Sequence, residues 1–368
     1  MSEHVYVSMK DIAAYVGVHV STVSLALHDS PKIRPETKKR ILEAANELGY
    51  RHNPYLSTLM KSRRVRKIPQ SSPVIGYITS HNTKDDWRKQ HVLLEFFDGC
   101  CEMARERGYR MEVFWRKDPT MSPRRFSEIL FHRGIQGIIL GPCTELDAHV
   151  DLNWELFSPV AIGHSIHHPQ LHRVTNNHFL STVRVMDYCH RIGAKKVGFV
   201  VQKVHTVRLQ HRWLGAYLAK RLELGLDEGI PPLITDNWSL PTIREWYERF
   251  RPEVIIGPFG SSVGNWLEST GVVVPDDVQL ISVACPRKGH RVTGVFENSK
   301  SIGAKAVQMV ISMIEHTEKG IPENPSTISM EGEWNPGSTV KRPSVPILPA
   351  DYSGMKEAAG APLLQNML

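Results

Sequence analysis

Apolar residues recur at helical spacing in two short segments near the N-terminus. Ile12, Ala13 and Val16 share one face of a first helix, which ends at Gly17 because glycine adopts the positive φ of a tight turn without strain. A second helix follows directly and points Val23 toward the same core. The pattern predicts two small amphipathic helices that pack together across the turn.

A third helix is predicted over residues 35–48. Pro35 suits its first turn, where the missing N–H would have no partner, and Gly49 is a natural stop. Its apolar positions are Ile41, Leu42, Ala45 and Leu48. Three helices within fifty residues predict a minimal all-α bundle.

Beyond residue 73 the pattern changes to short apolar strands that alternate with helices. A polar, basic, proline-punctuated stretch at residues 63–73 precedes it and is typical of a linker. We expect strands at 74–78, 110–115, 137–140, 160–162, 196–201, 254–256 and 279–283, and helices at 93–107, 123–133, 179–192 and 212–224. This alternation predicts the α/β class, with parallel sheets covered on both faces.

Positive charge is concentrated at the N-terminal end. Residues 1–68 contain twelve Lys or Arg and six Asp or Glu, which is +6 of the chain's net charge of +7. Phosphate is the natural partner of such a basic helical region, so the charge predicts nucleic-acid binding. The alternative is a solvated basic tail, which the helical pattern running through these residues disfavours.

Six short motifs follow one another in the first fifty residues: Lys10-Asp11-Ile12-Ala13, Gly17-Val18, Ser21-Thr22-Val23-Ser24, Pro35-Glu36-Thr37, Ile41-Leu42-Glu43-Ala44-Ala45 and Leu48-Gly49-Tyr50. In this order and density they resemble the lactose-repressor (LacI/GalR) family of bacterial transcription regulators. The resemblance implies a small all-α helix-turn-helix DNA-binding domain whose second helix enters the major groove of a double-stranded operator.

That resemblance places Val20, Ser21 and Leu25 at base-reading positions. Many members have Arg where this chain has Leu25, and Ser where it has His19. Losing the Arg removes a guanine contact worth roughly 1 to 3 kcal/mol of discrimination, so we expect a different operator sequence. The residues of this domain implied to contact DNA are Lys10, His19, Val20, Ser21, Thr22, Ser24, Leu25 and His28.

Residues 51–61 resemble the family's hinge helix, which folds on DNA, pairs with its twin in the minor groove and inserts a leucine between base steps. Leu59 holds the leucine position, and Asn53 and Tyr55 join it in the implied DNA contact set. The match departs at His52, where proline is usual. The alternative for Leu59 is an ordinary linker leucine that packs on the next domain.

The resemblance continues more weakly along the rest of the chain. It implies an α/β periplasmic-binding-protein-like effector domain of two doubly wound subdomains, joined by three crossovers, with a ligand cleft outside the carboxyl ends of the strands. The expected parts are residues 1–52 (helix-turn-helix), 53–72 (hinge and linker), 73–342 (effector-binding and dimerisation) and 343–368 (tail). Subdomain one is expected to hold residues 73–164 and 297–328.

Arg212 matches the family's ligand-binding arginine, which suits bidentate bonds to hydroxyls or a carboxylate. Trp238 matches a position where an aromatic ring stacks on the ligand, with a plain core tryptophan as the alternative. Acidic and amide positions of the family are replaced at His164, at Pro258-Phe259 and at Ala284 or Cys285, which favours an anionic, aromatic or otherwise unusual effector over a neutral sugar. The full candidate set is Ser80, His81, Trp87, His164, Arg212, Trp238, Pro258, Phe259 and Ala284.

Catalytic chemistry finds little support. A histidine cluster at His164, His167, His168 and His172 has spacings compatible with a metal, but no Cys or carboxylate joins it, so a solvated or ligand-facing crossover loop is the preferred interpretation. The sequence has no phosphate-cradling glycine loop and no nucleophile elbow. We expect no enzyme activity, no cofactor and no metal.

Five cysteines without framework spacing suit a reducing cytoplasm, and the longest apolar runs are too short to cross a membrane. A transported-solute-binding protein would need an export signal and no basic head. The expected function is therefore a cytoplasmic transcriptional regulator, a repressor, that binds a palindromic operator as a homodimer and responds to a small-molecule effector. The tail shows no sustained heptad for tetramers. The alternative is a DNA-binding regulator whose degenerate cleft takes no effector.

Overall fold

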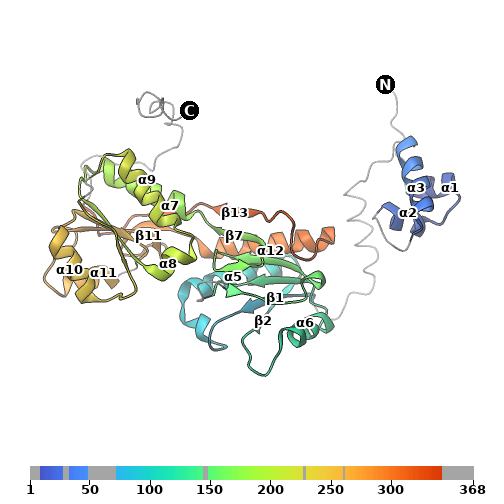
Figure 1. Cartoon of the computed structure of the whole chain (residues 1–368), viewed down its shortest axis with the longest axis horizontal. Helices are drawn as coiled ribbons and strands as arrows, with labels where there is room; N and C mark the ends of the chain where they lie inside the picture. The colour runs from blue at the N-terminus through green and yellow to red at the C-terminus, as the bar shows by residue number, and fades with distance from the viewer. Residues whose placement is uncertain are drawn as a thin grey trace. The chain divides into compact units, whose positions relative to one another are not determined.

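The computed structural model describes residues 9–27, 33–48, 72–143, 148–226, 229–259 and 262–341 (Figure 1). The chain forms two units, Met1–Ser71 and Ser72–Leu368. The hinge region and the C-terminal tail lie outside the described residues, so the predictions for Asn53, Tyr55, Leu59 and residues 343–368 are not addressed by it.

The N-terminal unit contains three helices: α1 (Met9–Val16), α2 (Val20–Leu27) and α3 (Pro35–Glu47). One fully buried side chain from each helix, Ile12, Val23 and Ile41, forms the centre of the core. Gly17 has φ +74° between α1 and α2, the conformation for which glycine is needed. The predicted bundle is confirmed, except that Leu42 is 41% exposed instead of contributing to the core.

Subdomain one is built on a six-stranded parallel sheet in the order β13-β7-β5-β3-β1-β2. The strands are β1 (Val74–Thr79), β2 (Arg110–Trp115), β3 (Gly137–Leu140), β5 (Ser158–Ile162), β7 (His172–Asn176) and β13 (Thr327–Met330). A separate pair, β4 (Ala148–His149) and β6 (Ile166–His168), forms a two-stranded sheet. Two 3-10 turns, η1 (Asp86–Lys89) and η2 (Trp154–Leu156), lie in loops of subdomain one.

Helices cover both faces of this sheet because its strands alternate between two apolar clusters. Ile75 and Ile139 pack on one side with α5 (His91–Glu106) and α12 (Ser299–His316), whereas Ile78 and Ile138 pack on the other side with α6 (Pro123–His132). The helices α5 and α12 cross closely at Gly99 and Gly303, where an added Cβ would lie 1.8 Å and 1.9 Å from backbone oxygens of the other helix.

Subdomain two has a second six-stranded sheet in the order β14-β12-β11-β10-β8-β9, with only β14 antiparallel to its neighbour. Its strands are β8 (Val197–Gln202), β9 (Leu233–Thr235), β10 (Val254–Gly257), β11 (Gln279–Cys285), β12 (Thr293–Phe296) and β14 (Glu333–Asn335). Its helices are α7 (His178–Arg191), α8 (Lys203–Arg208), α9 (Arg212–Glu223), α10 (Leu240–Phe250) and α11 (Ser262–Glu268). Apolar clusters on both faces of the sheet complete the predicted doubly wound α/β fold.

The chain passes between the subdomains three times, from β7 to α7, from β12 to α12, and from β13 to β14. The expectation that subdomain one leaves off at residue 164 is wrong, because β7 is a strand of its sheet and extends that subdomain to Asn176. The segment with the histidine cluster is accordingly not a crossover loop but forms β6 and β7.

The strand order fixes where polar side chains gather. In each sheet the first strand, β1 or β8, has the second strand on one side and the later strands on the other, so the order of the strands reverses beside it. Ligands of doubly wound sheets bind beyond the carboxyl ends of the strands at this reversal. Among the described helices none is long and apolar enough to cross a membrane.

Candidate DNA-recognition helix and effector site

A histidine, His19, caps the N-terminus of α2. His19 Nδ1 accepts a hydrogen bond from the Ser21 backbone N–H at 3.3 Å and lies 2.8 Å from the Ser21 hydroxyl oxygen. This is the bond that a serine or threonine commonly makes at a helix N-cap. The imidazole of His19 therefore takes the capping role, which is a structural reason for histidine at a position where the family often has serine.

The exposed positions of α2 define the surface available to DNA. Ser21 and Leu25 are exposed, with Leu25 at 39%, and Lys10 on α1 is exposed as well. Val20, Thr22 and Ser24 are half-buried, and Val20 also packs against the core. His28 lies outside the described residues. An apolar side chain standing in solvent at Leu25 suits contact with a thymine methyl group.

In the second unit, four basic side chains come together where the two subdomains meet. We call His164, Arg173, His178 and Arg212 the junction cluster. His164 follows β5 and Arg173 lies in β7, both in subdomain one, whereas His178 and Arg212 are the first residues of α7 and α9 in subdomain two. The rings of His164 and His178 are 6.0 Å apart. The fold thus joins groups that are up to 48 residues apart in sequence.

The electrostatics of the junction cluster are dominated by positive charge. Burial lowers the pKa of His164 to about 3, and Arg212, His178, Arg173 and His167 all act in the same direction. Burial also lowers the pKa of Arg173, and the neighbouring Arg212 adds to that effect. His164 is therefore neutral at pH 7 and is free to donate or accept a hydrogen bond.

Hydrogen bonds satisfy only part of the cluster. Arg173 donates to the carbonyl oxygens of Gly163 and Ile166, both at 3.1 Å, and Arg212 Nη2 donates to Gln210 Oε1 at 3.1 Å. Arg212 Nε is buried without a partner. Within the described residues, neither Arg173 nor Arg212 forms an ion pair with a carboxylate.

Further buried polar atoms without partners lie on the elements that carry these residues or adjoin them. They are Trp213 Nε1 in α9, Thr206 Oγ1 in α8, and Thr175 Oγ1 and Asn176 Oδ1 in β7. The Trp213 ring lies 5.1 Å from that of His178 and 6.5 Å from that of His205. Burial, and then Arg208, lower the pKa of His205 to about 4. A buried polar atom without a partner is costly, so these atoms suit a site that a polar ligand completes.

The carboxyl end of β1 places two predicted residues nearby. Ser80 and His81 are buried; the Ser80 hydroxyl accepts from Arg116, and His81 Nε2 lies 3.1 Å from the Pro142 carbonyl oxygen. Burial lowers the pKa of His81, the Pro142 bond and Asp86 oppose it, and Lys117 and Arg208 add to it. Arg208 is in α8, so a positive charge of subdomain two acts on a histidine at the end of β1.

Other predicted effector residues lie in apolar clusters. Trp87 is 1% exposed and packs against Tyr77 and Phe97 in the core of subdomain one, although its Nε1 has no partner among the described residues. Trp238 packs against Trp266, in the cluster that also contains Phe259. Pro258 and Ala284 are half-buried in subdomain two. The structure groups His164 with Arg212, whereas no hydrogen bond, ion pair or ring contact within the described residues joins Trp87, Trp238, Phe259 or Ala284 to them.

Sequence reasoning missed Arg173, His178 and Trp213. Trp213 directly follows Arg212, so its proximity was available from the sequence. Arg173 and His178 carry no such signal, because only the pairing of β7 with β5 and the packing of α7 bring them to Arg212. Within the described residues, no group of three or more His, Cys, Asp or Glu side chains is placed to hold a metal ion.

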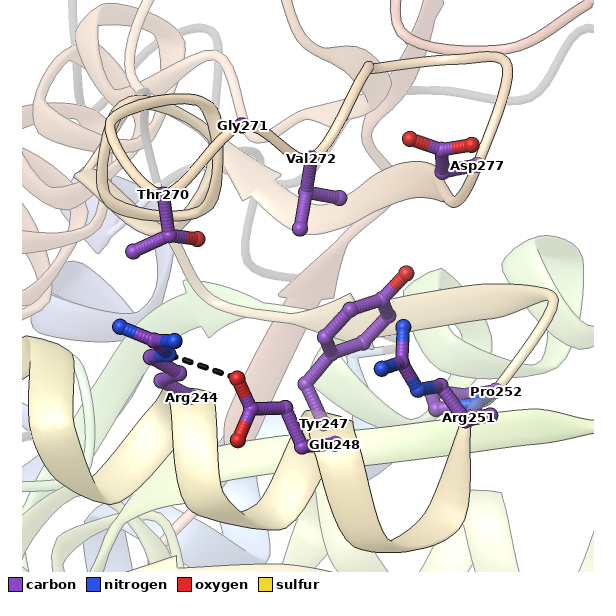
Figure 2. A pocket seen from close by; sticks show the side chains of 9 residues that line it. All are labelled: Arg244, Tyr247, Glu248, Arg251, Pro252, Thr270, Gly271, Val272 and Asp277. Atoms are coloured by element: carbon purple, nitrogen blue, oxygen red, sulfur yellow. Dashed lines mark hydrogen bonds and ion pairs between the residues drawn. The ribbon is translucent and has the colours of Figure 1, made fainter.

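A pocket of about 430 Å³ lies elsewhere in subdomain two, between α10 and the loop that leads to β11 (Figure 2). Its charged groups are already engaged: Arg244 Nε donates to Glu248 Oε1 at 2.7 Å, and Asp277 accepts from the Val273 N–H at 2.8 Å. Pro252 and Asp277 precede β10 and β11, so the pocket is at the amino ends of these strands. It contains none of the predicted effector residues.

Two protein-family models match the chain. The model described as bacterial regulatory proteins, lacI family, matches residues 8–53, and the model described as a periplasmic binding protein-like domain matches residues 186–340. The first match spans the three helices of the N-terminal unit. The second contains Arg212 but not His164 or Arg173.

Curated relatives align with different parts of the chain. It is 26% identical over 195 residues to the HTH-type transcriptional regulator MalR of Streptococcus pneumoniae, covering 53% of this chain and 56% of that protein. It is 25% identical over 296 residues to the HTH-type transcriptional repressor MelR of Bacillus subtilis, covering 75% and 81%. The match thus spans little more than half the length of the first relative.

Solved structures share the fold over nearly their whole length. A transcriptional regulator CelR-cellobiose complex matches with a TM-score of 0.56 and 16% identity, covering 90% of this chain and 99% of that one. The lac repressor dimer bound to operator and the anti-inducer ONPF matches with a TM-score of 0.53 and 12% identity, covering 91% and 99%. These likenesses establish the architecture of a helical N-terminal unit followed by two doubly wound subdomains.

Proposed function

The chain belongs to the lacI family of bacterial regulatory proteins, and from this premise we propose that it is a DNA-binding transcriptional regulator that acts as a repressor. The observation that most supports the proposal is α2, whose exposed Ser21 and Leu25 lie on a basic three-helix unit matched by the family model. Base-edge contacts from a helix in the major groove supply sequence specificity.

The proposed regulator is a cytoplasmic homodimer on a palindromic operator. A two-fold dimer presents two copies of α2 to two half-sites, so the symmetry of the protein requires symmetry in the DNA. The structure of the lac repressor dimer on its operator, which has the same fold, supports this arrangement by analogy. The implied DNA contacts of Asn53, Tyr55 and Leu59 belong to this proposal.

Random-site selection with the purified full-length protein tests the DNA-binding function. We expect an enriched palindrome, whose binding falls at least tenfold in the S21A/L25A double variant because both side chains are exposed on α2. Leu222→Ala is a matched control, since Leu222 is 77% exposed on α9 in the other unit. Recovery of no symmetric site would contradict the dimeric operator.

A small-molecule effector, a sugar or sugar derivative, is proposed to bind at the junction cluster and to change operator affinity. Ligand contact with Arg212 and His164 favours one relative orientation of the subdomains, which shifts the population of the DNA-binding form. The cellobiose complex of CelR supports a sugar-like effector by analogy. Ser80 and His81 lie at the carboxyl end of β1 and belong to the proposed site.

A thermal-shift screen of sugars, sugar acids and nucleobases tests the effector. A true ligand stabilises the wild type by mass action and stabilises Arg212→Ala much less. Equal stabilisation of both proteins would remove Arg212 from the site. If no compound changes stability or operator affinity, the regulator acts without an effector, and the DNA-binding proposal is unaffected.

A further inference from the structure

We propose that the effector carries an oxyanion group, a carboxylate or a phosphate, which binds between Arg212, Arg173 and His164 of the junction cluster. The inference rests on the proposed effector site and names the chemical class of its ligand. Such a ligand differs from an uncharged sugar in one testable respect, which is that its negative charge supplies the binding energy.

The first support is the balance of charge. Arg173 is 5% exposed and comes from subdomain one, while Arg212 is half-buried and comes from subdomain two, and the positive charge of Arg212 helps to lower the pKa of Arg173 across the junction. Within the described residues the carboxylate bonded to the cluster is that of Glu297, and its hydrogen bond is to His178 Nδ1, at 2.9 Å, and not to an arginine. These two like charges, one of them buried, have no bonded counter-ion and repel each other, and an oxyanion would remove that cost.

The second support is the supply of hydrogen-bond donors. Arg212 Nε and Trp213 Nε1 are buried N–H groups without acceptors, and they belong to consecutive residues in the first turn of α9. An N–H group cannot accept, so the missing partner has to be an acceptor. A carboxylate or phosphate presents two or three acceptor oxygens and no obligatory donor, so it can supply the acceptor that such an N–H group lacks.

The third support is the position of these donors on a helix. Arg212 is the first residue of α9, a twelve-residue helix whose backbone N–H groups point toward its start. The partial positive charge of that helix end adds to the guanidinium charges and favours an anion. His164 completes the surroundings as a neutral imidazole, which can donate one hydrogen bond to an oxyanion without adding repulsion between like charges.

Calorimetric titration of the full-length protein tests the inference with matched probes. D-glucuronate and D-glucose 6-phosphate are each compared with D-glucose, and inorganic phosphate is titrated against sodium chloride at equal ionic strength. We expect at least one oxyanion to bind with a Kd tenfold or more below that of its neutral counterpart. The carboxylate and phosphate arms then identify which oxyanion the site prefers.

Variants separate the junction cluster from the basic N-terminal unit, which also attracts anions. Arg212→Gln should reduce the affinity for the preferred oxyanion at least tenfold, and Arg212→Lys should recover part of it. Arg244→Gln, an exposed arginine on α10 in the same subdomain, should leave the affinity unchanged. If Arg212→Gln does not fold, His164→Asn provides the second test, with an expected loss of affinity for the same probe.

Equal affinity for charged and neutral sugars would overturn the inference, as would an oxyanion preference that survives in both Arg212→Gln and His164→Asn. Absence of binding by all the oxyanions, inorganic phosphate included, would overturn it too. None of these outcomes bears on operator selection, so the ligand class can fail while the DNA-binding function stands. Conversely, loss of operator selection with intact oxyanion binding would contradict only the regulator proposal.

Discussion

His178 Nδ1 lies 2.9 Å from Glu297 Oε1, and this hydrogen bond connects two of the three passages between the subdomains. His178 follows the passage from β7 to α7, and Glu297 lies in the passage from β12 to α12. Both side chains are nearly buried, at 7% and 11% exposed. The bond therefore couples the connecting segments about which any change in subdomain orientation has to occur.

Replacing this carboxylate should affect stability and ligand binding in opposite directions. Glu297→Gln removes the acceptor charge of a buried hydrogen bond, and we expect a loss of about 1 to 3 kcal/mol in the free energy of unfolding. It also removes the negative charge bonded to the junction cluster, so oxyanion affinity should rise. Urea unfolding and calorimetry check the two effects, and Glu333→Gln on an exposed ion pair is the control. A fall in both quantities would show that Glu297 acts only as a structural residue.

The cap formed by His19 predicts a local effect on α2. His19→Ala should weaken the start of the helix by about 1 kcal/mol, whereas His19→Ser, which restores a hydroxyl acceptor, should not. Hydrogen exchange of the α2 amides in the full-length protein measures this difference. His190→Ala, an exposed substitution in α7, should leave exchange in α2 unchanged. Equal exchange in the Ala and Ser variants would mean that the imidazole does not cap the helix.

Stability should fall on acidification because two histidines are buried in the neutral form. The pKa of His164 is about 3 and that of His205 about 4, against an ordinary value of 6.5. Between these values the unfolded chain binds more protons than the folded chain, so the stabilisation present above pH 6.5 is lost as the pH falls toward 4. Each histidine contributes a slope of roughly 1 kcal/mol per pH unit in that range.

Unfolding free energies measured from pH 7.5 to pH 5 check this slope. His164→Asn should flatten it, whereas His190→Asn, at an exposed position, should not. Added oxyanion ligand should also flatten it in the wild type, since a bound negative charge makes protonation of His164 less costly. An unchanged slope in His164→Asn would show that groups other than His164 cause the loss of stability at low pH.

The crossing of α5 and α12 predicts strict intolerance of a side chain at Gly303. An alanine Cβ there would lie 1.9 Å from the Phe96 carbonyl oxygen, so the two helices would have to separate. We expect Gly303→Ala to cost about 1 to 3 kcal/mol. Gly215→Ala in α9 is the control, because its Cβ would meet no atom within 4 Å and alanine favours the helix. Thermal unfolding of the two variants should therefore shift in opposite directions.

The apolar pattern missed α12, although the buried face of that helix is apolar, but it predicted short strands that consist of buried apolar residues. β3 and β10 consist of such residues, and their strands are where the pattern indicates. β7 was missed because Arg173 and Thr175 are polar, although both are buried; the carbonyl groups of Gly163 and Ile166 satisfy the guanidinium. Burial of a polar residue depends on partners that only tertiary structure supplies.

The candidate site shows the same limit. Arg212 could be found because a short motif accompanies it, whereas Arg173 and His178 become neighbours of Arg212 only after two sheets have formed. A tryptophan in the sequence does not by itself indicate an effector site. Trp87, a predicted effector residue, belongs to the core, whereas Trp213, which the sequence did not indicate, lies beside His178. Proximity across a junction is a property of topology and is not encoded in local spacing.

The three passages also set the order in which the chain can fold during synthesis. Subdomain one needs α12 and β13, which follow residue 298, to cover its sheet, whereas residues 177–296 contain every strand of the second sheet except the edge strand β14. Domains fold as their residues emerge from the ribosome. The second subdomain is therefore the first that can close its core, and truncation before α12 would leave the earlier-made half of the protein with an uncovered sheet.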